Sequence, residues 1–334
     1  MKTVLSGIRP TGNLHLGNYY GALINFLKMQ EDKDNRCFFF IADLHAMTTH
    51  PDPKMMQENV RNILATYLAC GLDPEKATIY IQSQIVEIVE LELLFGPFVS
   101  IAELSKVVTF KEKAKQQPKN VNVALFRYPV LMAADILVHN ADYVPVGKDQ
   151  EQHLEFTQHI ASRFNNRFGV NYFKEPTPFI VKDQALVKIP GLDGSGKMGK
   201  SEGNCIYLVD DPQTIEKKVK GALTDNGPEG ANTPKPEYIE NLFTILKVVS
   251  TPEVVAHYDH LWNAGEQKWY GNLKKQLAED IIKVTSPIRE RINDIKNDNA
   301  YLRRVTQAGA AKARESAGKT LRDVREIMGL NYFA

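Results

Sequence analysis

Cysteines are few in this 334-residue chain, and long apolar runs are missing. The three cysteines, Cys37, Cys70 and Cys205, lie far apart in the sequence. An odd number without a close pair argues against a disulfide framework and against a C-x-x-C zinc site, so we expect reduced thiols. No apolar stretch reaches the roughly 18 residues that a membrane-spanning helix needs, and no signal-peptide core is present near the N-terminus. These absences predict a soluble, cytoplasmic protein.

A strong net charge is missing too, since 41 Lys and Arg face 40 Asp and Glu. This balance excludes a histone-like chain but not a local basic patch. Residues 281–334 hold 11 Lys and Arg against 6 Asp and Glu, and the remainder of the chain is slightly acidic. A basic helical tail suggests a polyanionic partner. A solvated helix face would give the same composition, so both interpretations stay open.

Strands and helices alternate over the first 82 residues. Residues 38–41 are a continuous apolar run, and Asp52 followed by Pro53 is a typical helix start. We therefore predict strands at Lys2–Ser6, Arg36–Ala42 and Ala77–Gln82, and helices at Gly17–Gln30 and from Pro53 to about Cys70. This order predicts an α/β fold with a Rossmann-like, doubly wound parallel sheet, which binds nucleotides at the carboxyl ends of its strands.

The rest of the chain reads as mostly helical. Short strands are expected near Tyr143–Val146 and at Cys205–Val209, and helix starts at Asp211-Pro212 and Thr251-Pro252. Gly227–Pro236 is the best linker candidate because it is rich in Gly, Pro and Asn. We expect a catalytic domain at residues 1–206, with a helical insertion at about 85–140, and an all-helical domain at 207–334.

The first segment with residues suited to binding a ligand is Arg9–Asn18, which joins the first predicted strand to the first predicted helix. Glycines at such a junction let the backbone approach phosphates, and the N-terminus of a helix favours anions. His15 would be a neutral or cationic donor at that end. The segment predicts a phosphate site, although an ordinary turn with an exposed histidine would look the same.

The second segment, Gly194–Ser201, literally matches the P-loop pattern G-x-x-x-x-G-K-[ST]. A P-loop needs a strand before it and a helix after it. Pro190 and Gly191 break the preceding residues, and residues 202–204 begin no helix, so the match is accidental. A glycine-rich loop with two lysines can still clamp phosphates by charge, and a solvated surface loop is the alternative.

Two further segments place polar groups where a ligand could meet them. Asp135 is the single carboxylate in the apolar run Tyr128–Val138, and a buried carboxylate needs a donor. That donor could be a structural arginine, a helix N-terminus or a ligand N–H, and the residues alone favour a structural role. Polar residues also crowd beyond the expected strand end in Val144–His153. Without an H-E-x-x-H pattern, we expect no metal there.

In this order and spacing, the segments resemble bacterial tryptophanyl-tRNA synthetases, which are class I aminoacyl-tRNA synthetases. Residues 15–18 match the signature HIGH in its tryptophan-type form, and residues 197–201 match KMSKS with glycine in the middle. Residues 43–46, 132–137 and 144–150 also resemble the tryptophan subgroup. Arg9 and Thr109 depart from the pattern, because relatives often carry Gln at these places.

The resemblance implies that ATP activates L-tryptophan to tryptophanyl-adenylate, and that the 2′-hydroxyl of the terminal adenosine of tRNA(Trp) then takes the tryptophanyl group. It implies Mg²⁺ with the ATP and no structural metal. The implied catalytic residues are His15, Lys113, Lys197 and Lys200. The implied ATP-binding residues are Arg9, Pro10, Thr11, Gly17, Asn18, Gly147, Lys148, Asp149, Ile189, Lys197, Met198, Gly199, Lys200 and Ser201.

The resemblance also implies a tryptophan site in which Asp135 accepts the indole N–H. Its other members would be Met132, His45, Val144, Val146 and Gln150. The helical C-terminal part would read the anticodon, with the basic tail attracting the RNA backbone, and the protein would be a homodimer through the region of Leu94–Val108. A P-loop NTPase, a catalytically inactive RNA-binding relative and a tyrosyl-type synthetase remain as alternatives.

Overall fold

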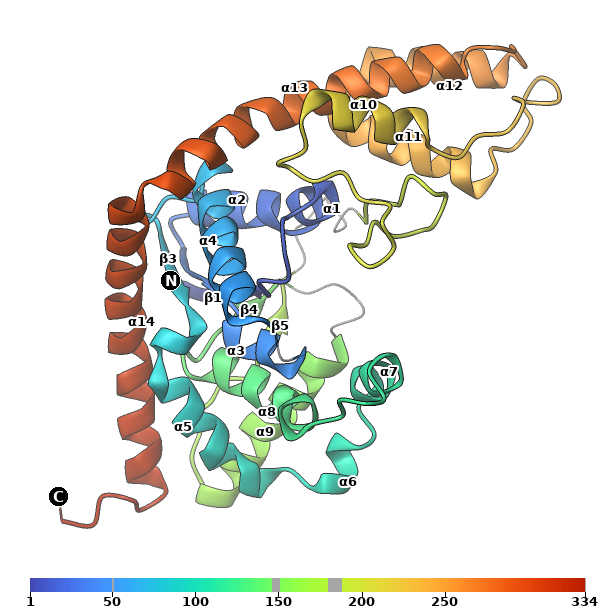
Figure 1. The fold of residues 1–334 in the computed structure, drawn as a ribbon. Helices are drawn as coiled ribbons and strands as arrows, with labels where there is room; N and C mark the ends of the chain where they lie inside the picture. The colour runs from blue at the N-terminus through green and yellow to red at the C-terminus, as the bar shows by residue number, and fades with distance from the viewer. Residues whose placement is uncertain (50, 146–150, 180–187, 334) are drawn as a thin grey trace.

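A parallel sheet with helices on both faces organises the protein, in a computed structural model that describes residues 1–49, 51–145, 151–179 and 188–333 (Figure 1). The strands lie in the order β3-β2-β1-β4-β5, and every neighbouring pair is parallel. Their bounds are β1 Lys2–Ile8, β2 Asn35–Ile41, β3 Ala77–Ile81, β4 Tyr143–Val144 and β5 Thr177–Pro178. The predicted α/β class is confirmed, while the two-residue strand β5 was not foreseen.

The strand order creates a switch point between β1 and β4. From β1 the chain moves to β2 and β3 on one side, and later to β4 and β5 on the other. Ligands of such sheets bind where the order reverses, beyond the carboxyl ends of the strands. A cavity of about 180 Å³ lies at this place, lined in part by Ser6, Gly7 and Ile8 of β1 and by Pro145 after β4.

Both faces of the sheet are buried. In β2, Cys37, Phe39 and Ile41 enter one core, whereas Phe38 and Phe40 enter the other. The first core includes residues of α2 (Ile24–Glu31) and α4 (Pro53–Ala69), and the second includes residues of α5 (Val86–Phe95), α8 (Val123–Leu137) and α9 (Glu151–Phe168). Burial on both sides explains why this strand reads as a continuous apolar run.

Helix starts largely follow their capping residues. The Asp52 carboxylate accepts from two backbone N–H groups of α4, and Asp211 caps α10 (Pro212–Lys220) in the same way. Instead of one helix at Gly17–Gln30, the chain forms the short α1 (Leu16–Asn18), a π-helical turn η1 (Tyr19–Leu23) and α2. Such π turns often occur at functional sites.

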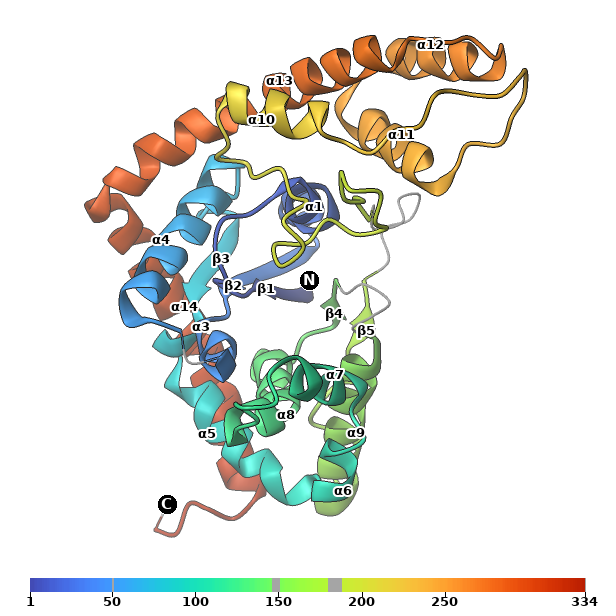
Figure 2. The ribbon, with the colours of Figure 1, turned by 45° about the vertical axis from the view of Figure 1, so that its right-hand side comes forward.

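Helices alone follow residue 210 in the part of the chain that the structure describes. They are α10, α11 (Glu237–Val249), α12 (Pro252–Asn263), α13 (Tyr270–Asn297) and α14 (Asn299–Ile327). Helix α13 leads back from the distal group of helices to the sheet, and α14 then runs along β3 and α5 (Figures 1 and 2). The domain division at residue 206 stays a prediction. No helix in the described ranges is long and apolar enough to cross a bilayer.

The prediction of a strand at Cys205–Val209 is wrong. Only Tyr207 makes a bridge, antiparallel to His15, and a turn follows at once. The Asp210 carboxylate accepts from the Tyr207 backbone N–H at 2.8 Å, which closes that turn before a strand can extend. Cys205 itself is a buried free thiol, as are the other two cysteines.

Short helices complete the fold and carry several site residues. They are α3 (Asp43–Ala46), η2 (Met47–Thr49), η3 (Gln82–Gln84), η4 (Gly96–Phe98), α6 (Ile101–Leu104) and α7 (Val108–Gln116). Helices α3 and η3 directly follow β2 and β3. Both therefore lie at the carboxyl edge of the sheet, where the ligands of such folds bind.

Candidate active site

The first predicted phosphate segment folds as a turn that places His15 at the N-terminus of α1. The ring is buried, and its Nδ1 atom has no hydrogen-bond partner in the described ranges. The Asn18 side chain accepts from the His15 backbone N–H at 3.1 Å and closes the turn. Burial, together with the charges of Lys200 and Lys197, lowers the pKa of His15 to about 4. The ring is therefore neutral near pH 7.

Two glycines give this turn its shape. Gly12 has a φ of +111°, a conformation that other residues rarely adopt, and its carbonyl accepts from Lys200 Nζ at 3.0 Å. A Cβ on Gly17 would lie 2.9 Å from atoms of the His15 ring. Glycine at both positions therefore lets a lysine and a histidine from different segments meet at one turn.

The lysine loop, residues 188–204, is organised around the buried side chain of Asn204. Asn204 Nδ2 donates to Ser195 Oγ at 2.8 Å and to Asp193 Oδ1 at 3.0 Å. Asn204 Oδ1 accepts from the Gly199 backbone N–H at 2.9 Å. No helix begins between residue 188 and Pro212. The loop is thus held by its own hydrogen bonds, and the prediction that its P-loop pattern is accidental is confirmed.

Positive charges gather beside the turn and the loop. Lys113 Nζ lies 4.0 Å from the centroid of the Tyr128 ring, and Lys200 reaches Gly12. Burial, followed by the charge of Arg9, lowers the pKa of Lys113 to about 8, and burial is also the main cause that lowers the pKa of Lys200 to about 8. Among the described residues, neither lysine has a carboxylate partner. Cationic side chains that lie near one another without carboxylate partners favour a polyanionic ligand.

One face of α8 carries the residues of the predicted tryptophan site. Tyr128, Met132 and Asp135 recur at a spacing of four and three residues, which puts them along one side of a helix. Tyr128 is the member of this face that the sequence analysis left out of the site. Its ring lies under Lys113 at one end of the face, and Asp135 lies at the other end. Tyr128 therefore joins the cationic region to the buried carboxylate.

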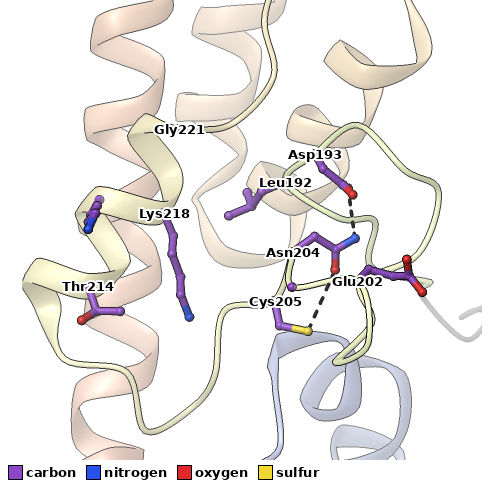
Figure 3. Close-up of a pocket in the computed structure, with 10 residues that line it drawn as sticks. Leu192, Asp193, Glu202, Asn204, Cys205, Thr214, Lys218 and Gly221 are labelled. Atoms are coloured by element: carbon purple, nitrogen blue, oxygen red, sulfur yellow. Dashed lines mark hydrogen bonds between the residues drawn. The ribbon is translucent and has the colours of Figure 1, made fainter.

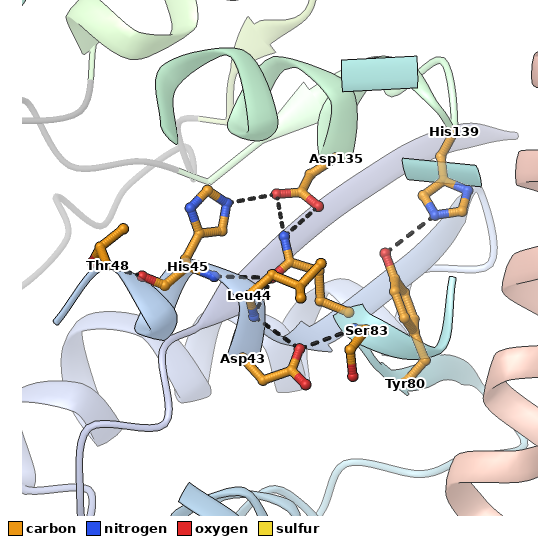
Figure 4. A network of polar contacts seen from close by, with 9 residues as sticks. Asp43, Leu44, His45, Thr48, Tyr80, Ser83, Asp135 and His139 are labelled. Atoms are coloured by element: carbon orange, nitrogen blue, oxygen red, sulfur yellow. Dashed lines mark hydrogen bonds and ion pairs between the residues drawn. The ribbon is translucent and has the colours of Figure 1, made fainter. Parts of the chain in front are cut away.

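Asp135 is only 1% exposed and lies in a network of polar contacts (Figure 4). Gln82 Nε2 donates to both carboxylate oxygens, at 2.8 and 2.9 Å, and His45 Nε2 lies 2.8 Å from Oδ2. Burial raises the pKa of Asp135, and its contacts with His45 and Gln82 oppose that rise. Its partners are thus a histidine and an amide, not the arginine or helix N-terminus that the sequence suggested.

Gln82 also fixes the helix that carries His45. Its Oε1 accepts from the Leu44 backbone N–H at 3.1 Å and lies 3.4 Å from the His45 backbone N. The Asp43 carboxylate in turn accepts from the Ser83 backbone N–H at 2.9 Å. These contacts tie the ends of β2 and β3 to α8. Since a carboxylate has about four acceptor positions and Asp135 uses three, one position on Oδ1 is left for a ligand donor.

A second polar group lies around Tyr128. The Tyr128 hydroxyl bonds Thr109 Oγ1, and His153 Nε2 lies 3.0 Å from the tyrosine oxygen and 2.9 Å from Thr109 Oγ1. Thr109 and Lys113 are four residues apart on α7, so both approach the same tyrosine. Thr109, which stands where relatives often carry Gln, therefore contacts both Tyr128 and His153.

Other predicted residues fall into three groups. Ile189, Met198 and Val144 have buried side chains that pack in the two cores and anchor their segments. Pro10 is buried, whereas Thr11, Ser201 and Lys197 are exposed. Lys197 lies close enough to His15 for its charge to lower the pKa of the histidine. Val146, Gly147, Lys148, Asp149 and Gln150 lie outside the described residues.

Gln82 and Tyr128 are the contributors that the sequence analysis missed. A signal existed for each: Gln82 directly follows a strand at the carboxyl edge, and Tyr128 shares a helical face with Asp135. Asn204 carried no such signal, because its role depends on the folded loop.

A larger cavity, of about 500 Å³, lies between the lysine loop and α10 (Figure 3). None of the predicted site residues lines it. Its wall includes Leu192 and Glu202 of the loop, Cys205 directly after the loop, and Thr214 and Lys218 of α10. Lys218 is already paired with Asp210, at 2.5 Å. The cavity is therefore an unfilled space on one side of the loop. It lies apart from the site that holds the cations and Asp135.

The described residues offer no site for a protein-held metal ion. No group of three or more His, Cys, Asp or Glu side chains in the described ranges is arranged to hold one. The groups that converge near His15 are cations, which do not suit Mg²⁺ as ligands.

Comparison with known proteins agrees with this geometry. The sequence matches the family described as tRNA synthetases class I (W and Y) over residues 1–286. It is 58% identical over 329 residues to the tryptophan–tRNA ligase of Porphyromonas gingivalis, covering 98% of this chain and 99% of that protein. The corresponding enzyme of Caldanaerobacter subterraneus is 42% identical over 334 residues, covering 99% of each chain.

Solved structures show the same relationship. The tryptophanyl-tRNA synthetase of Campylobacter jejuni, described as a complex with ADP and tryptophan, superposes with a TM-score of 0.84 at 32% identity and covers 98% of this chain and 99% of its own. The synthetase from Mycoplasma pneumoniae gives a TM-score of 0.81 at 32% identity, covering 98% of both chains. The chain therefore belongs to the bacterial tryptophanyl-tRNA synthetases, a branch of the class I tRNA synthetases.

Proposed function

We propose that this protein is a tryptophan–tRNA ligase. It activates L-tryptophan with ATP and transfers the tryptophanyl group to the 2′-hydroxyl of the terminal adenosine of tRNA(Trp). One observation carries the proposal above the others. Tyr128 lies under Lys113 and edge-on to the His45 ring that contacts Asp135, so it stands between a carboxylate with a spare acceptor position and cations without a carboxylate partner in the described ranges. An amino acid with an N–H on its ring and a carboxylate that reacts with a triphosphate fits this order of groups.

At the amino-acid end, Asp135 accepts the indole N–H. Gln82 and His45 hold the carboxylate in place, and the position on Oδ1 that they leave unused receives the indole N–H. Met132, on the same face of α8 as Asp135, and the buried Val144 are the proposed apolar walls of this site. Phenylalanine has no ring N–H, so its binding would leave a buried acceptor without a donor. That loss is an efficient basis for rejection.

At the phosphate end, the enzyme needs no nucleophile of its own. The substrate carboxylate is already ionised and attacks the α-phosphorus of ATP, with pyrophosphate leaving. Catalysis then consists of positioning and of stabilising the developing charge. Lys113, Lys197 and Lys200 neutralise the phosphates, and neutral His15 contributes a hydrogen bond through its unpartnered Nδ1.

The lysine loop closes over the pyrophosphate as the reaction proceeds. The unfilled space between the loop and α10 leaves the loop free to shift, while Asn204 keeps its internal shape. A rigid loop that moves as a unit delivers Lys197 and Lys200 together. Asp149 and Gln150 complete the proposed site as contacts to the ribose and the substrate amine.

The tRNA binds along the distal helices, with the anticodon near α11–α13. Part of the basic tail is already used inside the protein: Arg325 pairs with Glu90, and Arg314 Nε donates to the Gln84 carbonyl at 2.9 Å. The remaining exposed basic residues of α13 and α14 are the ones available to attract the RNA backbone, and they include Arg303, Arg304, Lys319 and Arg322.

The enzyme works in the cytoplasm as a homodimer. Helix α5 supports an interface, because Val86 and Leu93 are 68% and 66% exposed and share a face with Val89. This face borders the predicted region Leu94–Val108, of which Ile101 is the most exposed apolar residue. Leu93→Glu should shift the protein to a monomer in sedimentation velocity, and an unchanged mass would refute this interface.

ATP–pyrophosphate exchange with each of the twenty amino acids tests the function. We expect exchange with tryptophan and no appreciable exchange with tyrosine or phenylalanine, followed by charging of tRNA(Trp). Equal exchange with tyrosine would favour the tyrosyl-type alternative. No exchange with any amino acid would favour the catalytically inactive relative, and ATP hydrolysis without an amino acid would favour an NTPase.

A further inference from the structure

A buried polar chain leads away from the tryptophan site to the C-terminal helix. The His139 ring stacks on Phe38 with centroids 4.1 Å apart. Its Nε2 lies 3.2 Å from the Tyr80 hydroxyl (Figure 4), and its Nδ1 lies 3.1 Å from Ser316 Oγ of α14. Burial lowers the pKa of His139 to about 3, so the ring is neutral. One ring nitrogen then donates and the other accepts, which both hydroxyl partners can satisfy.

Helix α14 contacts the end of β3 and the residues after it at two further points. A Cβ on Gly309 would lie 1.8 Å from the Ile79 carbonyl oxygen, so the helix approaches the strand as closely as glycine allows. Five residues later, Arg314 Nε donates to the Gln84 carbonyl at 2.9 Å. These two contacts and the His139 bridge all fall on residues 79–84. Three contacts of the C-terminal helix thus converge on one short segment.

That same segment holds the carboxylate of the tryptophan site. Tyr80 and Gln82 are two residues apart and point to the same side of the chain, while Asp135 and His139 are four residues apart along α8 and its end. Two parallel contacts result, Gln82 with Asp135 and Tyr80 with His139 (Figure 4). Ser316 fastens the outer contact to α14, and nothing in the proposed chemistry requires this outer contact.

We propose that His139 and Ser316 are positioning residues for tryptophan: they hold the end of β3 against α8, so that Gln82 aims the spare acceptor position of Asp135 at the indole N–H. This proposal rests on the proposed function, in which Asp135 reads that N–H. The residues act on the orientation of a carboxylate, and they touch neither ATP nor the reacting atoms.

Packing alone does not require these polar groups. Helix α14 also buries Ala310, Ala313, Ala317 and Val324 in the core beneath the sheet. The serine hydroxyl is half-buried among them, so replacing it with alanine removes one hydrogen bond and little packing. Ser316→Ala therefore separates positioning from general support by the helix.

The test compares two substrates in ATP–pyrophosphate exchange. The first is tryptophan, and the second is β-(3-benzothienyl)alanine, an isostere in which sulfur replaces the indole N–H. The variants are Ser316→Ala and His139→Phe, the second keeping an aromatic ring on Phe38 while losing both polar contacts. Thr306→Val is the matched control, because the Thr306 hydroxyl is also on α14 but bonds only carbonyls of its own helix. Asp135→Asn tests the proposed function separately.

We expect Ser316→Ala and His139→Phe to lower the preference for tryptophan over the isostere by about three- to tenfold, with the KM for ATP unchanged. Thr306→Val should leave the preference unchanged, and Asp135→Asn should lower it most. If only Asp135→Asn lowers it, or if Thr306→Val lowers it as much as Ser316→Ala, the positioning role is wrong and the proposed function stands. If neither Asp135→Asn nor Asp135→Ala, which keeps no acceptor at all, lowers the preference, the indole contact is wrong and the positioning role falls with it. Should His139→Phe not fold, Ser316→Ala decides alone.

Discussion

The two ends of the catalytic crevice are built in opposite ways. At the amino-acid end, Asp135 is buried, and Gln82 and His45 already meet most of its hydrogen-bonding capacity. At the phosphate end, Lys113 and Lys200 lie together without carboxylate partners in the described ranges, and their pKa values are lowered to about 8. One end is complete before substrate arrives, and the other is completed by the substrate.

This difference follows from what each end must recognise. An indole differs from other rings by shape and by one N–H, so it is read best by a fixed acceptor in a packed site. A triphosphate carries several charges that change position during the reaction, so it is held best by cations that can move with a loop. A change at one end should therefore leave the other end little affected.

The largest expected effect is at Asp135. Asp135→Ala should lower kcat/KM for tryptophan by about 2–4 kcal/mol, roughly 30- to 900-fold, because a buried charged partner is lost. The KM for ATP should change little. Steady-state pyrophosphate exchange over both substrate concentrations measures this split.

Asp135→Asn is the control for folding, because it keeps the size of the side chain and can still accept from Gln82. Thermal melting of both variants accompanies the kinetics. If Asp135→Ala stays folded in thermal melting and keeps the kcat/KM for tryptophan, the carboxylate does not read the indole N–H and the first half of the comparison fails.

Next in size is the effect at Lys200. Lys200→Ala should lower kcat by about 10²-fold with little change in the KM for tryptophan, because its charge matters most as pyrophosphate leaves. Lys33→Ala, at an exposed lysine before the amino end of β2, is the matched loss of charge away from the crevice. A large rise in the KM for tryptophan in Lys200→Ala would mean that the two ends are not separate.

The smallest expected effect is at Gly199. A Cβ there would lie 3.2 Å from Cγ of Glu202, an exposed and flexible side chain that can give way. Its φ is not in the left-handed region, so serine brings no backbone strain. Gly199→Ser should therefore change kcat and the KM for ATP by no more than about threefold. Loss of ATP binding would instead indicate that the backbone at Gly199 contacts phosphate closely, as in a P-loop.

Much of the fold follows from local patterns. The apolar run of β2 and the capping residues Asp52 and Asp211 determine elements whose signals lie within a few neighbouring residues. Cys205–Val209 has a similar apolar pattern, yet it forms only one bridge because the following turn, closed by Asp210, redirects the chain. A pattern of a few residues does not contain that competing contact.

The site could be predicted where a signature carries it, and not where the contact is long-range. His15 and Lys200 lie in recognisable segments, and the structure brings them to the same turn. His45 was among the predicted site residues, but its contact with Asp135, and that of Gln82, depend on how the ends of β2 and β3 meet α8. The interaction of Thr109 with His153 likewise depends on how helices pack, which no sequence spacing encodes.

Calorimetric titration at pH 8 tests the central difference between the two ends most directly. Lys113 and Lys200 are each about half-protonated there, and a bound triphosphate should return their pKa values toward the ordinary lysine range, so ATP binding should take up about one proton. Tryptophan binding should take up almost none. Measuring both in buffers of different ionisation enthalpy gives the proton count, and above pH 8 the affinity for ATP should fall while that for tryptophan holds. No uptake with ATP, or equal uptake with both ligands, would contradict the account.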